Sequence, residues 1–169
     1  MLLDVSIIVK SQQGSIPFRF EAEPALLEEI SDEERQVRSA TVEGSAVCVS
    51  DRICVEADIT CRYSAVCGRC AKELECKLEQ HASEYFFNKA VGADCDEEHY
   101  EYAGHCIDLS KMIADSVQSA FPIRELCTPD CKGICPMCGC DLNVKRCSCN
   151  TDKIDPRLEI LSKLFEGES

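Results

Sequence analysis

Cysteine is the residue type in this chain that offers the most chemistry, since 15 of the 169 residues are cysteine. The densest group lies between residues 127 and 149 and holds seven of them. Within it, Cys135-Pro-Met-Cys138-Gly has the form of a zinc knuckle, because two intervening residues let both thiolates point at one ion about 2.3 Å away. Cys147-x-Cys149 follows as a second pair. We therefore predict a structural zinc site with four thiolate ligands, Cys135, Cys138, Cys147 and Cys149.

Two further pairs are Cys67-Gly-Arg-Cys70 and Cys127-x3-Cys131. Our hypothesis is that these four cysteines form a second structural zinc site, which would join the β-rich part of the chain to its C-terminal segment. The alternative is a single site with the other pairs unused, built from Cys127, Cys131, Cys135 and Cys138. The expected cofactor is thus Zn²⁺, with one or two structural ions.

Catalytic chemistry is not indicated by the remaining motifs. A catalytic zinc keeps one coordination position open and usually includes His or a carboxylate, whereas an all-cysteine site is closed. The chain has no Gly-rich phosphate loop, no Gly-x-Ser-x-Gly and no His-Glu-x-x-His. We therefore expect no catalytic residues and no enzyme activity. The enzyme alternative is a thiol oxidoreductase, because both C-x-x-C pairs have dithiol spacing, but neither precedes a predicted helix.

Seven cysteines lie outside these pairs, and five of them have no convincing partner by spacing: Cys48, Cys54, Cys95, Cys106 and Cys140. Cys61 and Cys76 lie on apolar strand faces and are predicted to be small core residues. Cys140 could replace a neighbouring ligand. The total count is odd, and no basic leader with an apolar run precedes the first predicted strand. We therefore expect a cytoplasmic protein whose clustered cysteines bind metal rather than form disulfides. No apolar run approaches the length of a membrane span, so no membrane partner is expected.

The charge pattern limits the class of partner. The chain carries a net charge of −13, which argues against bulk binding of nucleic acid, since that binding needs Lys and Arg to neutralise phosphates. The acidic residues are densest in residues 21–34 and 94–101, which contain no Lys or Arg, while the cysteine segments are slightly basic. A few contacts to RNA or to a protein partner remain possible in those segments, and the candidate residues are Arg69, Lys132, Lys145 and Arg146.

Strands are predicted in the first half of the chain. Residues 53–67 alternate apolar odd positions with polar even positions, which is the two-residue period of a half-buried strand. The β-rich run 41–50 ends at Asp51-Arg52 and predicts a hairpin with that strand. Shorter alternations predict strands at 16–21 and 74–79. Residues 21–34 could form a short surface helix, and residues 94–101 read as a solvated loop.

Helices are predicted later in the chain. Apolar residues recur at three- and four-residue spacing over 108–121, with Asp108 as the expected N-cap and Pro122 as the stop. A second helix is expected to start at Asp155-Pro156. The predicted fold class is α+β: an antiparallel β meander or small barrel with one or two packed helices and a C-terminal zinc-ribbon-like module. The expected division is a β-rich core with its helix over 1–122 and a cysteine-rich module with a C-terminal helix over 123–169, together forming one compact unit.

Several of these motifs occur together in a known family. They are Cys67-Gly-Arg-Cys70, Ile107-Asp108-Leu109, Pro122, Leu126-Cys127, Asp130-Cys131-Lys-Gly-Ile-Cys135-Pro-x-Cys138-Gly139, Leu142-Asn143, Cys147-x-Cys149 and Asp155-Pro-Arg-Leu158. In this order the chain resembles the YceD family, the large ribosomal RNA subunit accumulation proteins. It departs from the family pattern in Ile134, where Leu is usual, and in the cysteine at position 140.

The resemblance implies a non-enzymatic role in making or stabilising the large-subunit ribosomal RNA during ribosome biogenesis. The partners it implies are a large ribosomal subunit precursor, ribosomal RNA or a ribosomal protein, with no small-molecule substrate. Two alternatives are retained. One is a zinc-ribbon adaptor or regulator with protein partners only, and the other is the thiol oxidoreductase.

Overall fold

The computed structural model describes residues 1–50, 52–89 and 100–149. These residues form two compact units. The first, which we call the sheet unit, comprises Met1–Cys67 and Lys72–Glu125. The second, which we call the cysteine module, comprises Gly68–Ala71 together with the described residues from Leu126 to Cys149. A short turn from far upstream in the sequence therefore belongs to the same unit as the C-terminal cysteines.

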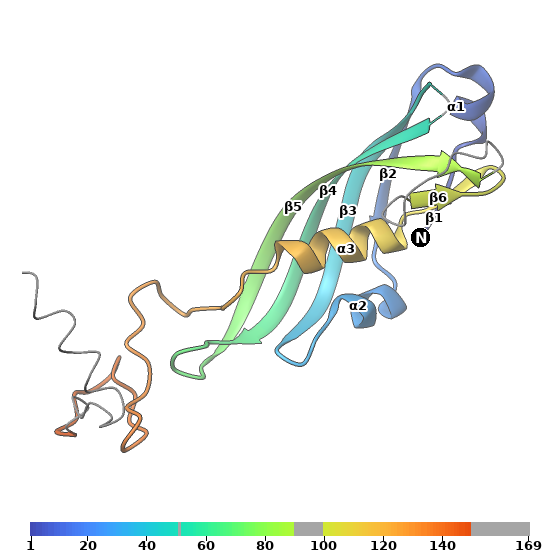
Figure 1. Ribbon diagram of the computed structural model, residues 1–169. Coiled ribbons are helices and arrows are strands. Elements are labelled where there is room, and N and C mark those ends of the chain that lie inside the picture. Colours follow the sequence, from blue (N-terminus) through green and yellow to red (C-terminus); the bar gives the residue numbers. More distant parts are fainter. Residues whose placement is uncertain (51, 90–99, 150–169) are drawn as a thin grey trace, which may run out of the picture. The chain divides into compact units, whose positions relative to one another are not determined.

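The sheet unit is built on one long antiparallel meander (Figure 1). Its strands pair in the order β2-β3-β4-β5-β6, and only the last pair is parallel. The bounds are β2 (Ser15–Glu21), β3 (Arg35–Val49), β4 (Arg52–Val66), β5 (Glu73–Asn88) and β6 (Tyr100–Tyr102). The predicted hairpin at residues 51 and 52 is confirmed, since Val49 pairs with Arg52. Of the two expected arrangements the described strands form the meander, with β2 and β6 at its edges.

The alternation in β4 explains which face of the sheet carries the core. Every odd-numbered residue from 53 to 67 is buried, as the two-residue period predicted. Cys61 is among them, fully inaccessible to solvent, and burial raises the pKa of its thiol to about 11. It is thus an inert core residue. Cys76, on β5, is half-buried and packs against the same core.

The strand predicted at 41–50 was too short at its N-terminal end, because β3 begins at Arg35. The pairing register with β4 shifts between Val37 and Ser39, which is a β-bulge at Arg38. A bulge inserts one extra residue and reverses the alternation of sides, so the two-residue period cannot be followed across it. Strand β5 likewise extends well beyond the predicted 74–79.

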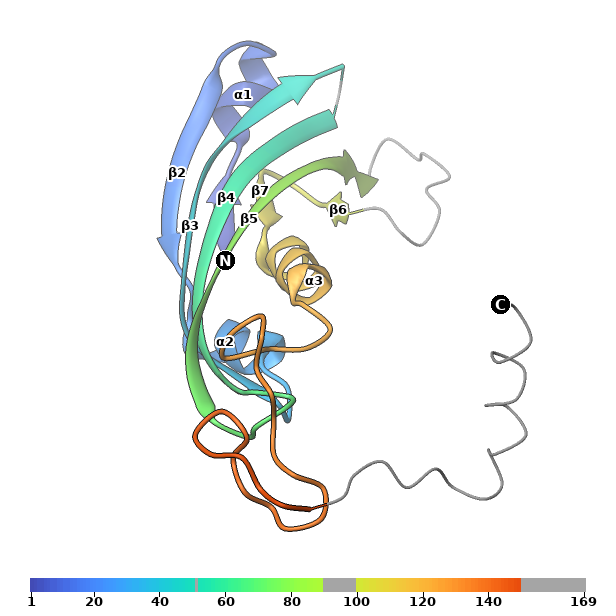
Figure 2. The ribbon, with the colours of Figure 1, turned by 90° about the vertical axis from the view of Figure 1, so that its left-hand side faces the viewer.

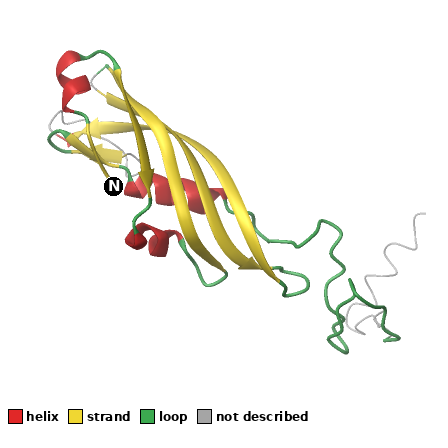
Figure 3. Cartoon of the chain, turned by 180° about the vertical axis from the view of Figure 1, so that it is seen from behind, coloured by secondary structure: helices red, strands yellow, loops and turns green. Residues whose placement is uncertain are grey.

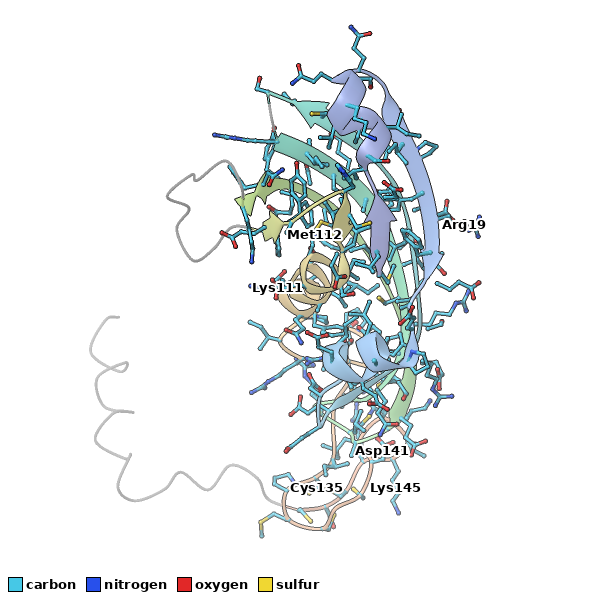
Figure 4. The ribbon with its side chains drawn as sticks, turned by 90° about the vertical axis from the view of Figure 1, so that its right-hand side faces the viewer. Arg19, Lys111, Met112, Cys135, Asp141 and Lys145 are labelled. Carbon is cyan, nitrogen blue, oxygen red and sulfur yellow. The ribbon has the colours of Figure 1, made fainter. Side chains whose placement is uncertain are left out.

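Two helices pack on one face of the sheet, as Figure 2 shows: α2 (Pro24–Ile30) and α3 (Ser110–Ala120). Helix α3 buries Met112, Ile113 and Val117 against the core. In Figure 4 Met112 points towards the sheet, while Lys111 points away from it. The opposite face of the sheet carries polar side chains such as Arg19, which Figure 4 shows projecting outward. A third helix, α1 (Ser6–Ser11), buries Ile8.

The predicted N-cap of α3 is displaced by one residue. The cap is Leu109, and Asp108 is the last residue of strand β7 (Cys106–Asp108), which pairs with β1 (Leu2–Asp4). The Asp108 carboxylate still accepts a hydrogen bond from the backbone N–H of Ser110 at 3.0 Å, and a second from the Met1 ammonium group at 3.0 Å. The helix ends at Ala120, just before Pro122, as expected.

The fold is therefore α+β, with sheets that are mainly antiparallel and few helices. The helix expected from Asp155 lies outside the described residues, as does the acidic stretch up to residue 99; Tyr100 and Glu101, which complete that stretch, belong to β6. Within the described part of the chain, no helix is long and apolar enough to cross a membrane.

Candidate metal centres

The first cysteine pair lies where β4 ends. Cys67 follows the last residue of the strand, and its N–H donates to the carbonyl of Lys72 at 2.8 Å. This bond closes a tight turn, in which Ala71 adopts a left-handed conformation with φ of 57°. Because the turn is short, Cys67 and Cys70 lie close together along the backbone, and their sulfurs can reach the same ion.

Four sulfurs gather at this turn and form what we call the first cluster: Cys67, Cys70, Cys127 and Cys131. Their Sγ atoms all lie within 4.8 Å of one another, and those of Cys70 and Cys127 are 3.6 Å apart. Four thiolates around one tetrahedral Zn²⁺ would stand about 3.8 Å apart, given a Zn–S distance of about 2.3 Å. The spacing in the first cluster therefore fits a single tetrahedral ion.

A second cluster has the same composition and consists of Cys135, Cys138, Cys147 and Cys149. Its Sγ atoms also lie within 4.8 Å of one another. The knuckle is closed by two backbone hydrogen bonds, from Gly139 N–H to the carbonyl of Cys135 at 2.8 Å and from Cys135 N–H to the carbonyl of Cys140 at 2.9 Å. Gly139 has a φ of 71°, a left-handed conformation that glycine adopts without strain.

The thiols in and beside the second cluster differ in pKa because each has different neighbours. The backbone N–H of Cys140 and the neighbouring thiols lower the pKa of Cys138 to about 6. The same crowding has the opposite effect on Cys140, where burial and the thiols of Cys138 and Cys147 raise the pKa to about 12. Cys138 therefore releases its proton more readily than an ordinary thiol, and a cysteine must be deprotonated to bind a metal. Cys140 lies beside the cluster as a fifth sulfur.

The structure groups the sulfurs of the eight cysteines that the sequence proposed as ligands into two sets of four. Cys127 and Cys131 lie with the pair at residues 67 and 70, not with Cys135 and Cys138 as the single-site alternative required. No disulfide joins any of the cysteines in the part of the chain that the structure describes. Neither cluster includes His, Asp or Glu, so each offers a closed, all-sulfur donor set that could hold a metal ion.

Arg69 lies within the turn of the first cluster and bonds to its backbone. The guanidinium Nη1 donates to the carbonyl of Cys131 at 2.8 Å and to that of Pro129 at 3.3 Å. The carbonyl of Arg69 accepts the N–H of Ile134 at 3.2 Å. Gly133, with a φ of 74°, lies so close that an added Cβ would be 2.9 Å from the Arg69 carbonyl oxygen. These contacts hold the two loops of the module together.

Sequence reasoning did not single out Asn143 as a functional residue. Its Nδ2 donates to the sulfur of Cys131 at 3.4 Å, and its Oδ1 accepts the N–H of Lys132 at 2.8 Å. Two sequence signals pointed to this position: Leu142-Asn143 is one of the family motifs, and an Asp lies two positions before Asn143. Asp141 Oδ1 accepts the N–H of Asn143 at 2.8 Å in an Asx turn.

The other proposed contact residues, Lys132, Lys145 and Arg146, are exposed on the loops of the cysteine module. Figure 3 shows these loops without helix or strand, and Figure 4 shows Lys145 projecting outward from them. None of the three cations forms an ion pair with any residue that the structure describes. Their charges are available to an external partner, whereas the Arg69 guanidinium is engaged with backbone carbonyls.

Comparison with known proteins gives relatives of two kinds. An uncharacterized protein of Mycobacterium tuberculosis is 28% identical over 124 residues, which are 72% of this chain and 59% of that protein. A chloroplastic protein of Arabidopsis thaliana, named large ribosomal RNA subunit accumulation protein YCED homolog 1, is 38% identical over 60 residues, 36% of this chain and 19% of that one. Its Zea mays counterpart is 38% identical over 55 residues, 32% of this chain and 19% of that protein.

The chain thus matches about three-fifths of the length of its mycobacterial relative and a much smaller share of the plant proteins. No solved structure matches it significantly. The family profile described as large ribosomal RNA subunit accumulation protein YceD matches residues 55–165, a range that contains both cysteine clusters. Because that match covers more than half of the sequence, the chain belongs to the YceD family.

Proposed function

We propose that this protein is a non-enzymatic, cytoplasmic factor that supports accumulation of the large-subunit ribosomal RNA, and that it carries a structural Zn²⁺ at each cysteine cluster. The observation that carries the proposal is the pair of all-cysteine clusters within the matched family region. All-sulfur sets leave no coordination position open for a substrate, so these sites suit a binding protein better than a metalloenzyme.

The proposed ligand sets are the first and second clusters as the structure groups them. Zn²⁺ bound by four thiolates would cross-link loops that have little secondary structure of their own. Among the described residues from 126 to 149 there is no helix or strand, and the one β-type backbone pairing is an isolated bridge between Ile134 and Asp141. Such a segment buries little apolar surface, so metal ligation would supply most of its stability. In this respect it resembles a zinc ribbon.

The partner contact is proposed to involve Lys132, Lys145 and Arg146. They are exposed and free of ion pairs within the described structure, and they lie on the unit that is not strongly acidic. Three cations supply few phosphate contacts, so association with ribosomal RNA in a large-subunit precursor should be specific and moderately sensitive to salt. A basic ribosomal protein would instead complement the acid elsewhere on the chain.

The test is co-sedimentation of the full chain with large-subunit precursor particles from cell extract. We expect it to travel with them, and we expect the triple variant Lys132→Ala, Lys145→Ala, Arg146→Ala to lose this association. The matched control replaces three exposed cations of the sheet unit with alanine: Lys10, Arg62 and Lys111. This control removes the same total charge from a different unit, so it should retain the association.

Ribonuclease treatment separates the proposal from the adaptor alternative. Association through RNA should be lost when the extract is digested, whereas an adaptor with protein partners only would stay bound. Absence of the chain from precursor particles in untreated extract would contradict the proposal.

The placement of the C-x-x-C pairs argues against the oxidoreductase alternative, although the lowered pKa of Cys138 would also suit a reactive thiol. Both C-x-x-C pairs lie in turns, and neither turn is followed by a helix in the described residues, unlike the strand–helix junction of dithiol catalysts. An insulin-reduction assay, with zinc content measured on the same sample, checks this point. Reductase activity in protein that contains no zinc would overturn the proposed function.

A further inference from the structure

Asn143 belongs to one cluster by its place in the sequence and to the other by its contacts. It lies between Cys138 and Cys147, the inner ligands of the second cluster. Its side chain nevertheless donates a hydrogen bond to the sulfur of Cys131, in the first cluster, at 3.4 Å. The loop between Cys138 and Cys147 is therefore held at both ends by the second cluster, while its Asn143 amide donates to the Cys131 sulfur of the first cluster.

The position of that amide is fixed on several sides. Asp141 Oδ1 accepts both the backbone N–H and the Nδ2 of Asn143, each at 2.8 Å. The N–H of Leu142 donates to the carbonyl of Gly133 at 2.9 Å. The Oδ1 of Asn143 accepts the N–H of Lys132, the neighbour of Cys131. With both amide atoms occupied, the side chain has a single orientation, which aims Nδ2 at the sulfur.

A second connection runs through the turn of the first cluster. The carbonyl of Arg69 accepts the N–H of Ile134, which directly precedes Cys135 of the second cluster. The guanidinium of the same residue binds the carbonyl of Cys131. When Cys67 and Cys70 close on an ion, this turn is fixed, and the start of the second cluster's knuckle is fixed with it.

From these contacts we propose that the two metal sites bind cooperatively and that Asn143 is the residue that couples them. The inference rests on the proposed structural Zn²⁺ sites. An N–H donor stabilises a thiolate that carries negative charge, and it is best placed only when the loop from 139 to 146 is ordered. Metal at the second cluster orders that loop at both ends, so the first cluster then binds without that entropic cost. By linkage, metal at the first cluster strengthens the second by the same factor.

The experiment loads the full chain with cadmium-113, which substitutes for Zn²⁺ in thiolate sites and gives one NMR resonance per site. Chelator titration then reports the occupancy of each site separately, and variants in each cluster assign the resonances. The test variant is Asn143→Ala, and Asn143→Asp keeps the acceptor for Lys132 while removing the donor to the sulfur. The control is Val144→Ala, whose exposed side chain lies next to it in the same loop.

The expected result is that both Asn143 variants weaken metal affinity at the first cluster by roughly 10- to 100-fold, the range for lost outer-shell hydrogen bonds, and shift its resonance. Val144→Ala should do neither. In the double variant Cys138→Ser, Cys149→Ser, which removes the second site, affinity at the first should already be reduced, and adding Asn143→Ala should change it little further.

Four results would overturn the inference. The first is a first-cluster affinity that responds to Asn143→Ala no more than to Val144→Ala. The second is an Asn143 effect of the same size in the chain that lacks the second site, because Asn143 would then act locally. The third is the independent release of two tightly bound ions, which would overturn the coupling alone. The fourth is a chain that takes up no metal, which would remove the proposed metal sites as well.

Discussion

Gly133→Ala is the substitution whose effect on the cysteine module can be worked out most directly. Gly133 has a φ of 74°, and a left-handed conformation costs an alanine roughly 1–2 kcal/mol. The new Cβ would also stand 2.9 Å from the carbonyl oxygen of Arg69, which must move away. That carbonyl accepts the N–H of Ile134, and loss of such a bond costs about 0.5–1.5 kcal/mol. The combined penalty is about 1.5–3.5 kcal/mol.

Gly139→Ala is the matched control within the same unit. Gly139 has nearly the same backbone conformation, with a φ of 71°, but no atom lies within 4 Å of its would-be Cβ. This variant should therefore carry the cost of the left-handed conformation alone. Because metal binding and folding of the module are coupled, both penalties should appear as weaker metal affinity. We expect roughly a 10- to 300-fold loss for Gly133→Ala and about a 5- to 30-fold loss for Gly139→Ala.

The assay is competition for Zn²⁺ with a chromogenic chelator, run on the full chain beside a thermal melt of the sheet unit. The melt should be unchanged in both variants, since neither glycine belongs to that unit. If Gly133→Ala and Gly139→Ala weaken affinity equally, the close approach of Arg69 contributes nothing and the argument from the contact fails.

Three other substitutions have definite expected outcomes. Cys67→Ser should lower the zinc content from two equivalents to one and leave the second cluster loaded, and unchanged metal content would rule out the first site. Gly44→Ala should destabilise the sheet unit by about 3 kcal/mol in urea unfolding, because its Cβ would lie 2.1 Å from the carbonyl oxygen of Glu56 on the adjacent strand, whereas Ser45→Ala should change little. Burial alone would raise the pKa of Asp108, but hydrogen bonds from the backbone at the start of α3 and from the N-terminal ammonium outweigh it and lower that pKa. Its stabilising effect should be full above pH ~4 and lost as the pH falls through the lowered value; Asp108→Asn should remove this part of the acid sensitivity, and equal acid sensitivity in both proteins would argue against it.

The sheet was predictable where one local rule holds over a long stretch. In β4 the two-residue period persists from residue 53 to 67, and each odd position is buried. The rule fails in β3, where the bulge at Arg38 reverses the alternation. It also gives no warning of Gly44, whose lack of a side chain is required by the carbonyl of the neighbouring strand and by the ring of Phe18. Such close approaches depend on register, and register is a tertiary property.

The cysteine clusters also could be predicted from the sequence only in part. Spacing identifies a pair of thiols, because two sulfurs a few residues apart can reach one ion, but it does not say which pairs share that ion. The structure places the pair at residues 127 and 131 with the one at 67 and 70. The contacts that accompany this pairing are the Arg69 guanidinium on the Cys131 carbonyl, the Arg69 carbonyl on Ile134, and the Asn143 amide on the Cys131 sulfur. Each joins residues that are distant in sequence or separated by a cluster ligand, so no spacing rule encodes it. A prediction of metal sites from sequence therefore needs the hydrogen-bond partners of the ligands as well as the ligands themselves, since those partners determine how the pairs combine.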